Sequence, residues 1–145
     1  MTRRTLAALL PLTLLASACN KNETPTSATT TTAVTVAAPT TTEHFLGTVP
    51  VGGSSFYAFT VGENGTVNVT LTSVGGAGVP TSAWMGLGLG TPSAEDCTTT
   101  SALNAQSGAS PQLTATYTPG IYCARIYDIG NLFAPATFAV TIDHP

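Results

Sequence analysis

The stretch Thr66-Val67-Asn68-Val69-Thr70-Leu71-Thr72 alternates polar and apolar side chains at every step. Successive side chains of a β-strand point to opposite faces of its sheet, so the three apolar residues of this stretch would all lie on one face. Residues 57–61 and 138–142 place large apolar side chains at every second position in the same way. These three runs predict strands that each turn one face towards a hydrophobic core.

The segment 43–145 contains further runs of this kind and no convincing helical pattern. Short β-rich runs occur at 44–49, 55–61, 66–73, 83–89, 111–117, 121–127 and 136–142, with Gly, Pro and Asn between them. Regularly spaced short strands predict an all-β fold, and we expect an antiparallel β-sandwich of about seven or eight strands. Because Asn and Gly tolerate positive φ, Glu63-Asn64-Gly65 is expected to form a hairpin turn between the second and third strands.

The first residues have the features of an export signal. Arg3 and Arg4 form a short basic region, and the twelve residues 5–16 form an apolar region. This region is shorter than the roughly 20 residues that a transmembrane helix needs. Ala16-Ser17-Ala18 then supplies the small residues that a signal peptidase requires. Residues 1–18 are therefore predicted to be a signal peptide that is removed on export.

Cys19 follows this cleavage site directly, and Leu15-Ala16-Ser17-Ala18-Cys19 resembles the bacterial lipobox. The resemblance implies that Cys19 becomes the mature N-terminus and carries a lipid, which anchors the protein in a membrane of the cell envelope with its domain outside the cytoplasm. Asn20 rather than Asp follows the cysteine, which by analogy with other lipoproteins implies the outer membrane in a host with two membranes. Ordinary signal peptidase would instead leave a secreted protein with a free thiol.

Residues 19–42 are predicted to be a flexible linker between the lipid and the domain. Ten of the nineteen residues from Thr24 to Thr42 are threonine, with Pro25 and Pro39 among them. The segment has no sustained apolar period, so it cannot bury enough surface to offset the entropy of ordering. Such a linker would span roughly 75 Å when extended and about 25 Å as a coil.

The chain has three cysteines, and an odd number in an exported protein requires an explanation. If Cys19 carries lipid, Cys97 and Cys123 remain and can form a disulfide in an oxidising compartment. A metal site is not expected, because neither cysteine has a His or another Cys at ligand spacing. Cys123 shares a face of its strand with Arg125, which is costly to bury unpaired, so that face should point outward and Cys97 should come from the loop after the fourth strand.

The fourth run would turn Met85, Leu87 and Leu89 inward, with Trp84 and the glycines at 86, 88 and 90 on the opposite face. Glycine inside a strand usually marks the close approach of another group. One candidate for that group is the protein's own 91–110 loop, held down by the disulfide. A second candidate is a ligand stacked on Trp84 above the glycines, which makes Trp84 a candidate ligand platform. The third reading is a strand whose assignment is shifted by one residue.

Composition and motifs argue against several functions. Charged residues make up only 8% of the chain, compared with about 25% in ordinary proteins. After signal removal, Lys21 and Arg125 remain against seven acidic residues, so no basic surface for nucleic acid is expected. No nucleophile elbow, zinc-protease motif or phosphate-binding loop is present, and His44 and His144 are expected to be separate surface residues. We therefore expect no enzymatic activity, metal or cofactor.

The order of the motifs resembles that of the bacterial pre-peptidase C-terminal domain. An aromatic strand at 56–61 is followed by Gly65-Thr66-Val67, by Gly120-Ile121-Tyr122 and by a closing alternating strand. The resemblance covers about residues 44–145 and implies a jelly-roll-like β-sandwich that serves as a binding or targeting module. Some members bind calcium through acids on the middle strand, but Trp84-Met85-Gly86 supplies no acid at that place.

Two functional hypotheses follow from these observations. The first is a non-catalytic, monomeric module that is anchored to membrane lipid through Cys19 and binds an envelope glycan or protein. The alternative is a secreted or envelope hydrolase, or its accessory subunit, with an unrecognised active site.

Overall fold

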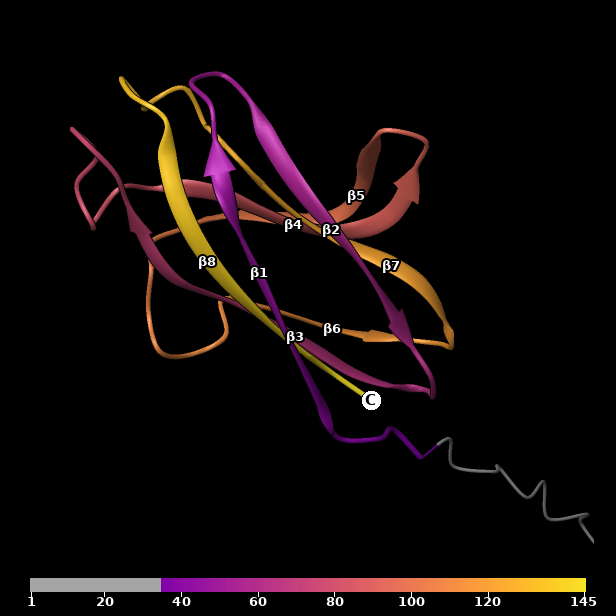
Figure 1. Cartoon of the computed structure of the whole chain (residues 1–145). Coiled ribbons are helices and arrows are strands. Elements are labelled where there is room, and N and C mark those ends of the chain that lie inside the picture. Colours follow the sequence, from indigo (N-terminus) through magenta and orange to yellow (C-terminus); the bar gives the residue numbers. More distant parts are fainter. Residues whose placement is uncertain (1–34) are drawn as a thin grey trace, which may run out of the picture. The chain divides into compact units, whose positions relative to one another are not determined.

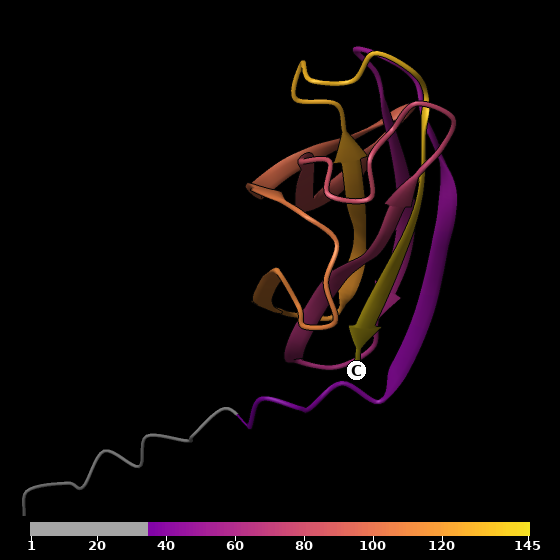
Figure 2. The same cartoon turned by 90° about the vertical axis from the view of Figure 1, so that its left-hand side faces the viewer.

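The computed structural model describes residues 35–145, which form two four-stranded antiparallel sheets packed face to face (Figures 1 and 2). The strands are β1 (Thr41–Val49), β2 (Ser54–Val61), β3 (Gly65–Gly75), β4 (Met85–Ser93), β5 (Asp96–Ala105), β6 (Leu113–Tyr117), β7 (Gly120–Tyr127) and β8 (Ala136–His144). The predicted signal peptide, the predicted lipidation site Cys19 and most of the predicted linker lie outside the described residues. No helix in the described part is long and apolar enough to cross a membrane.

The strands are ordered β1-β8-β3-β6 in one sheet and β2-β7-β4-β5 in the other. The chain crosses between the sheets at every connection except that from β4 to β5. Eight antiparallel strands wound between two sheets in this order form a jelly roll. The predicted antiparallel β-sandwich is confirmed, and all seven predicted strands are present.

The core lies between the sheets and is built from the alternation that the sequence shows. Val67, Val69 and Leu71 of β3 are completely buried, as are Met85, Leu87 and Leu89 of β4. The other large buried side chains include Phe45, Val49, Phe59, Val61, Ile126, Phe138, Val140 and Ile142. Both sheets contribute to this set, so each sheet is held by the apolar surface that it buries against the other.

The predicted hairpin at Glu63-Asn64-Gly65 is wrong. β2 and β3 belong to different sheets, so the turn carries the chain across the sandwich. Gly65 does not have a positive φ. A Cβ at Gly65 would lie 2.7 Å from the carbonyl oxygen of Ala37 and would also collide with the ring of Pro145. Glycine is therefore required there by the close approach of other chain segments, and the turn motif alone could not show which sheet the next strand would join.

The folded domain begins earlier than the predicted boundary at residue 43. β1 begins at Thr41, inside the segment predicted as linker. Before it, the Ala37 amide donates to the Asn64 carbonyl at 2.8 Å, and the Thr66 amide donates to the Ala37 carbonyl at 3.1 Å. These backbone hydrogen bonds depend on the neighbouring turn, which explains why a composition of Thr, Ala and Pro did not reveal them.

The segment 91–110, predicted as a loop, contains β5, the one strand that the sequence did not predict. β5 pairs with β4 along its whole length, from Met85 opposite Ala105 to Ser93 opposite Asp96. Its Thr-rich sequence carries few apolar side chains for an alternation to reveal. The backbone N–H and C=O groups that β5 turns towards β4 are nevertheless satisfied by hydrogen bonds with that strand.

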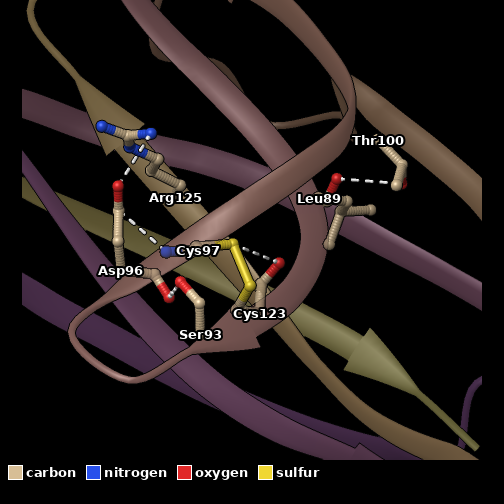
Figure 3. Close-up of a disulfide and its surroundings, with 7 residues drawn as sticks. All are labelled: Leu89, Ser93, Asp96, Cys97, Thr100, Cys123 and Arg125. Carbon is tan, nitrogen blue, oxygen red and sulfur yellow. Dashed lines mark hydrogen bonds and ion pairs between the residues drawn. A yellow bond between two sulfur atoms is a disulfide. The ribbon is translucent and has the colours of Figure 1, made fainter.

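Cys97 at the start of β5 forms a disulfide with Cys123 of β7, with Cα atoms 5.9 Å apart (Figure 3). The predicted pairing is thus present, but Cys97 belongs to a strand rather than to a loop. β4 lies between β5 and β7 in the sheet, so the β4–β5 hairpin must curl over β4 for Cys97 to reach Cys123. Both cysteines are almost completely buried by this arrangement.

The glycines of β4 make room for this curl and for a neighbouring ring. A Cβ at Gly90 would collide with the carbonyl of Thr98, and one at Gly88 would lie 2.6 Å from the Thr99 methyl group. A Cβ at Gly86 would collide with the ring of Tyr127. The glycine face is therefore filled by the protein's own residues and offers no trough for a ligand.

We expect the disulfide to stabilise the domain by about 2–4 kcal/mol, because it closes a loop in the unfolded chain. The double variant Cys97→Ser/Cys123→Ser, which leaves neither free thiol, should remain folded with a free energy of unfolding lower by that amount. Denaturant unfolding of oxidised wild type, reduced wild type and the variant measures this. Equal midpoints for all three would contradict the expectation.

Candidate functional site

The connections between strands gather at two opposite ends of the sandwich. We call apical the end formed by the loops 50–53, 76–84, 106–112 and 128–135, which lies on the left-hand side in Figure 1. We call basal the end formed by the turns 62–64 and 118–119 together with residues 35–40 and Pro145. The turn 94–95 belongs to neither end, because the β4–β5 hairpin curls over β7 beside Cys123. This division follows from the antiparallel alternation of the strands.

A cleft of about 270 Å³ opens at the apical end between the loops 76–84 and 128–135. It is lined by Gly78, Val79, Pro80, Ser82, Ala83, Trp84, Asn131, Leu132 and Phe133. Trp84 is 49% exposed and Phe133 is 97% exposed, whereas Leu132 is buried. The cleft therefore presents two accessible aromatic side chains above an apolar floor.

Asp128 orders the loop that carries Phe133. Its Oδ1 accepts hydrogen bonds from the amides of Gly130, Asn131 and Leu132 at 2.8 to 3.2 Å. Its Oδ2 accepts one from the amide of Gly52 at 2.8 Å, in the neighbouring 50–53 loop. Burial by itself would raise the pKa of Asp128, but these four N–H donors outweigh it and hold that pKa below its usual value.

Side-chain hydrogen bonds connect the remaining apical loops. The Asn131 amide donates to the Trp84 carbonyl at 3.0 Å, which joins the two walls of the cleft. Gln106 donates to the Ser82 carbonyl at 2.5 Å, and the Ser107 hydroxyl donates to the Thr81 carbonyl at 3.1 Å. All four loops are thus tied together, so the cleft is held in shape by the protein itself.

Trp84 lies in surroundings that differ from those that the sequence predicted. Trp84 precedes β4 and lines the apical cleft, rather than standing in a row with the β4 glycines. Phe133, which faces the same cleft, was missed because it lies in a loop without alternation. The only available signal was a large aromatic residue between Gly, Asn and Pro in the segment 128–135.

The cleft lining contains no acidic, basic or histidine side chain. Its polar groups are the Asn131 amide, the Ser82 hydroxyl and backbone atoms. Such a site can stack a ring and form neutral hydrogen bonds with it. Among the lining residues there is neither an acid–base pair nor an activated nucleophile of the kind that hydrolysis by side chains requires.

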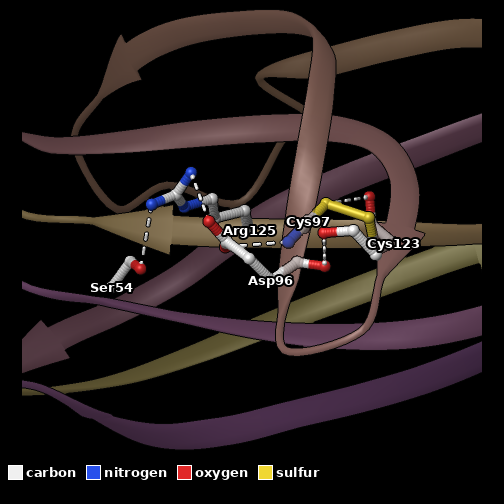
Figure 4. Close-up of polar contacts among 6 residues, drawn as sticks. Ser54, Asp96, Cys97, Cys123 and Arg125 are labelled. Atoms are coloured by element: carbon white, nitrogen blue, oxygen red, sulfur yellow. Dashed lines mark hydrogen bonds and ion pairs between the residues drawn. A yellow bond between two sulfur atoms is a disulfide. The ribbon is translucent and has the colours of Figure 1, made fainter.

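A second polar group lies beside the disulfide and holds β5 and β2 to β7 (Figure 4). The Arg125 guanidinium lies 3.5 Å from the Asp96 carboxylate and donates to the Ser54 hydroxyl at 3.1 Å. It also lies 5.6 Å from the centre of the Tyr127 ring. Arg125 faces outward together with Cys123, as predicted, but the neighbouring strands half-bury it. These contacts support a structural role.

The prediction that both histidines lie on the surface is correct for His44 and wrong for His144. His144 is 4% exposed, and its Nε2 lies 3.0 Å from the Glu43 carboxylate on the paired strand β1. Its ring packs 5.3 Å from that of Phe59. Within residues 35–145, no three His, Cys, Asp or Glu side chains gather closely enough to hold a metal ion.

We expect Asp128→Ala to lower the free energy of unfolding at neutral pH by about 1 kcal/mol, comparable with the loss of a helix cap. Since the folded-state pKa of Asp128 is lowered, its ionised form stabilises the fold above the ordinary carboxyl range, and this contribution is lost as the pH falls through the lowered pKa. The stability difference between wild type and variant should therefore shrink at acidic pH.

Denaturant unfolding across the acidic range measures this difference. Asp143→Ala is the matched control, because Asp143 lies at the basal end and accepts one hydrogen bond, from Thr42 at 2.6 Å. Limited proteolysis should detect loosening of the 128–135 loop in the Asp128 variant only. Identical pH profiles and cleavage patterns in both variants would argue against the role of Asp128.

Comparison with known proteins does not place the chain in a family. No model of a known protein family matches it, and no curated protein matches it. The site is therefore interpreted from its own geometry.

Proposed function

We propose that this protein is a lipid-anchored cell-envelope protein whose β-sandwich is a non-catalytic binding module, with the apical cleft as its ligand site. The anchor is proposed from Arg3 and Arg4, the apolar region and the lipobox-like cysteine. The module is proposed from the cleft and from the resemblance of the motif order to the pre-peptidase C-terminal domain. Its partners are membrane lipid at Cys19 and an envelope ligand at the cleft.

The observation that carries the binding role is the pair of accessible aromatic side chains over a preformed cleft. Aromatic side chains that protrude without covering core residues contribute little to folding, yet they offer a large apolar area to a ligand. The hydrogen bond that Asp128 accepts from Gly52 and the one that Asn131 donates to Trp84 fix the loops before a ligand arrives. A preformed site avoids part of the entropy cost of ordering loops on binding.

The chemistry of the lining favours a neutral sugar. The C–H face of a sugar ring packs well on an aromatic face, and its hydroxyl groups can bond to the Asn131 amide, the Ser82 hydroxyl and the backbone. A charged ligand would find no opposite charge in the lining. The volume of about 270 Å³ is slightly below the range of about 300–1,000 Å³ for drug-sized ligands, so it suits a single ring or a chain end.

For the anchor, we expect Cys19→Ala to abolish incorporation of radiolabelled fatty acid and to move the protein from the detergent phase to the aqueous phase. The disulfide variant Cys97→Ser/Cys123→Ser, which keeps Cys19, should still be labelled. Mass spectrometry of the wild-type N-terminus checks the same point directly. An unmodified Cys19 at the mature N-terminus would show that the lipoprotein proposal is wrong.

For the ligand, we expect neutral oligosaccharides from envelope material to change the fluorescence of Trp84, the only tryptophan of the chain. Phe133→Ala should weaken binding at least about tenfold, equivalent to roughly 1.4 kcal/mol, without a large change in melting temperature. Trp84→Ala should do the same when binding is measured by calorimetry. The matched control is Ile121→Ala, which removes an exposed apolar side chain at the basal end.

Two results would count against this assignment. One is binding that survives in the Trp84 and Phe133 variants, which would place the ligand elsewhere. The other is a large loss of melting temperature in these variants with no sugar bound by the wild type, which would make the aromatic pair part of the fold.

A further inference from the structure

The acidic side chains of the domain are distributed unevenly between its two ends. Residues 35–145 contain six of them, of which three lie at the basal end: Glu43, Glu63 and Asp143. Glu95 and Asp96 belong to the β4–β5 hairpin that curls over β7, where Asp96 pairs with Arg125. The sixth, Asp128, is apical, and its carboxylate is occupied by four backbone N–H donors. The basal end is therefore anionic, whereas the apical end carries almost no available charge.

The apical end is also where large apolar side chains are exposed. Val51, Trp84, Ile129 and Phe133 protrude from three of its loops. The Gly52–Asp128 and Asn131–Trp84 hydrogen bonds hold these loops together. The four side chains define what we call the apical surface, which includes the mouth of the cleft.

The chain enters the domain at the opposite end. Ala37 is bonded to the basal turn at Asn64, and the Thr40 amide donates to the His144 carbonyl at 3.0 Å. From Thr41, β1 runs to the apical loop 50–53, and its nine residues rise roughly 27 Å at about 3.4 Å per step. Any tether attached through residue 35 therefore leaves the domain far from the apical surface.

We propose that the apical surface meets a neutral glycan presented from beyond the membrane that carries the protein, while the acidic basal surface keeps the domain from lying down on that membrane. This inference rests on the proposed function of the cleft and adds the direction from which its ligand comes. An anionic lipid surface repels the three basal acids at short range, within a Debye length of about 8 Å at physiological salt.

Insertion of the apical loops into the protein's own membrane fits the charges less well. Loops that dock on anionic lipid usually combine apolar side chains with lysine or arginine, which are attracted to the headgroups. The four apical loops contain neither residue. The apical surface also surrounds a concave site with an amide and a hydroxyl group, which suits a sugar ring better than an acyl chain.

The fluorescence of Trp84 shows whether the apical surface faces the membrane or points away from it. The mature chain beginning at Cys19, with its disulfide oxidised, can be coupled through the Cys19 thiol to maleimide lipid in anionic vesicles, whether or not cells acylate it. Nitroxide lipid headgroups should leave Trp84 emission nearly unchanged, and soluble acrylamide should quench it as in free protein. The dissociation constant for a neutral oligosaccharide should stay within about twofold of its solution value.

The charge-reversed variant Glu63→Lys/Asp143→Lys tests the part played by the basal acids, since Glu63 is exposed in the basal turn and Asp143 accepts a single side-chain hydrogen bond, from Thr42. On anionic vesicles it should show stronger nitroxide quenching of Trp84 than the wild type, and on vesicles of neutral lipid the two should agree. Equal quenching on anionic vesicles would overturn the role of the basal acids.

Strong nitroxide quenching of the wild type would overturn the outward orientation and would indicate that the apical loops lie on the carrying membrane. This readout needs no sugar, so it stands even if the titrations find none and the proposed function fails. If sugar binds in solution but not on vesicles, the orientation alone is wrong.

Discussion

The close passage of β5 over Gly90 of β4 is the constraint on which the disulfide-bonded part of the sheet depends. β4 separates β5 from β7 in the sheet, yet Cys97 and Cys123 are bonded across it. The hairpin can curl this tightly only because position 90 has no side chain, since a Cβ there would collide with the Thr98 carbonyl. The disulfide, the Arg125–Asp96 ion pair and the β-bulge after Leu89 all follow from this crossing.

The jelly-roll topology separates the core that holds the fold together from the loops that are free to bind a ligand. Because the strands alternate in direction, four loops gather at the apical end, while the turns 62–64 and 118–119 and both ends of the described chain gather at the basal end. The core between the sheets is complete without the apical side chains of Trp84 and Phe133, which leaves them accessible. A rigid sandwich that presents loops in this way is a common arrangement for binding.

Because the chain has a low charge content, the structural contacts of its few ionised groups can be described one by one. Arg125 joins three strands beside the disulfide, and the Glu43–His144 pair fastens β1 to β8 where the chain ends. Glu43 also raises the pKa of the neighbouring Tyr57 hydroxyl. Asp128 is the ionised group that shapes the apical loops, through four backbone N–H groups rather than a cation.

The sequence by itself determined the features that depend on local pattern. Alternation in three runs identified strands together with their buried faces, as at Val67, Val69 and Leu71, because a period of two follows directly from strand geometry. Short β-rich runs between turn residues identified the other four strands. The count of cysteines pointed to the Cys97–Cys123 pair. The outward face of Cys123 and Arg125 followed from the cost of burying an unpaired charge.

Only the tertiary structure decided which strands became neighbours. The sequence of the turn at Asn64-Gly65 is the same whether the turn closes a hairpin or crosses between sheets. β5 lacks an alternation of apolar side chains because hydrogen bonds to β4, rather than buried side chains, hold it in the sheet. The cleft arose because Trp84 and Phe133, 49 positions apart in the chain, are brought together by two loops at one end. Such long-range proximity depends on the packing of the whole chain, and no local spacing encodes it.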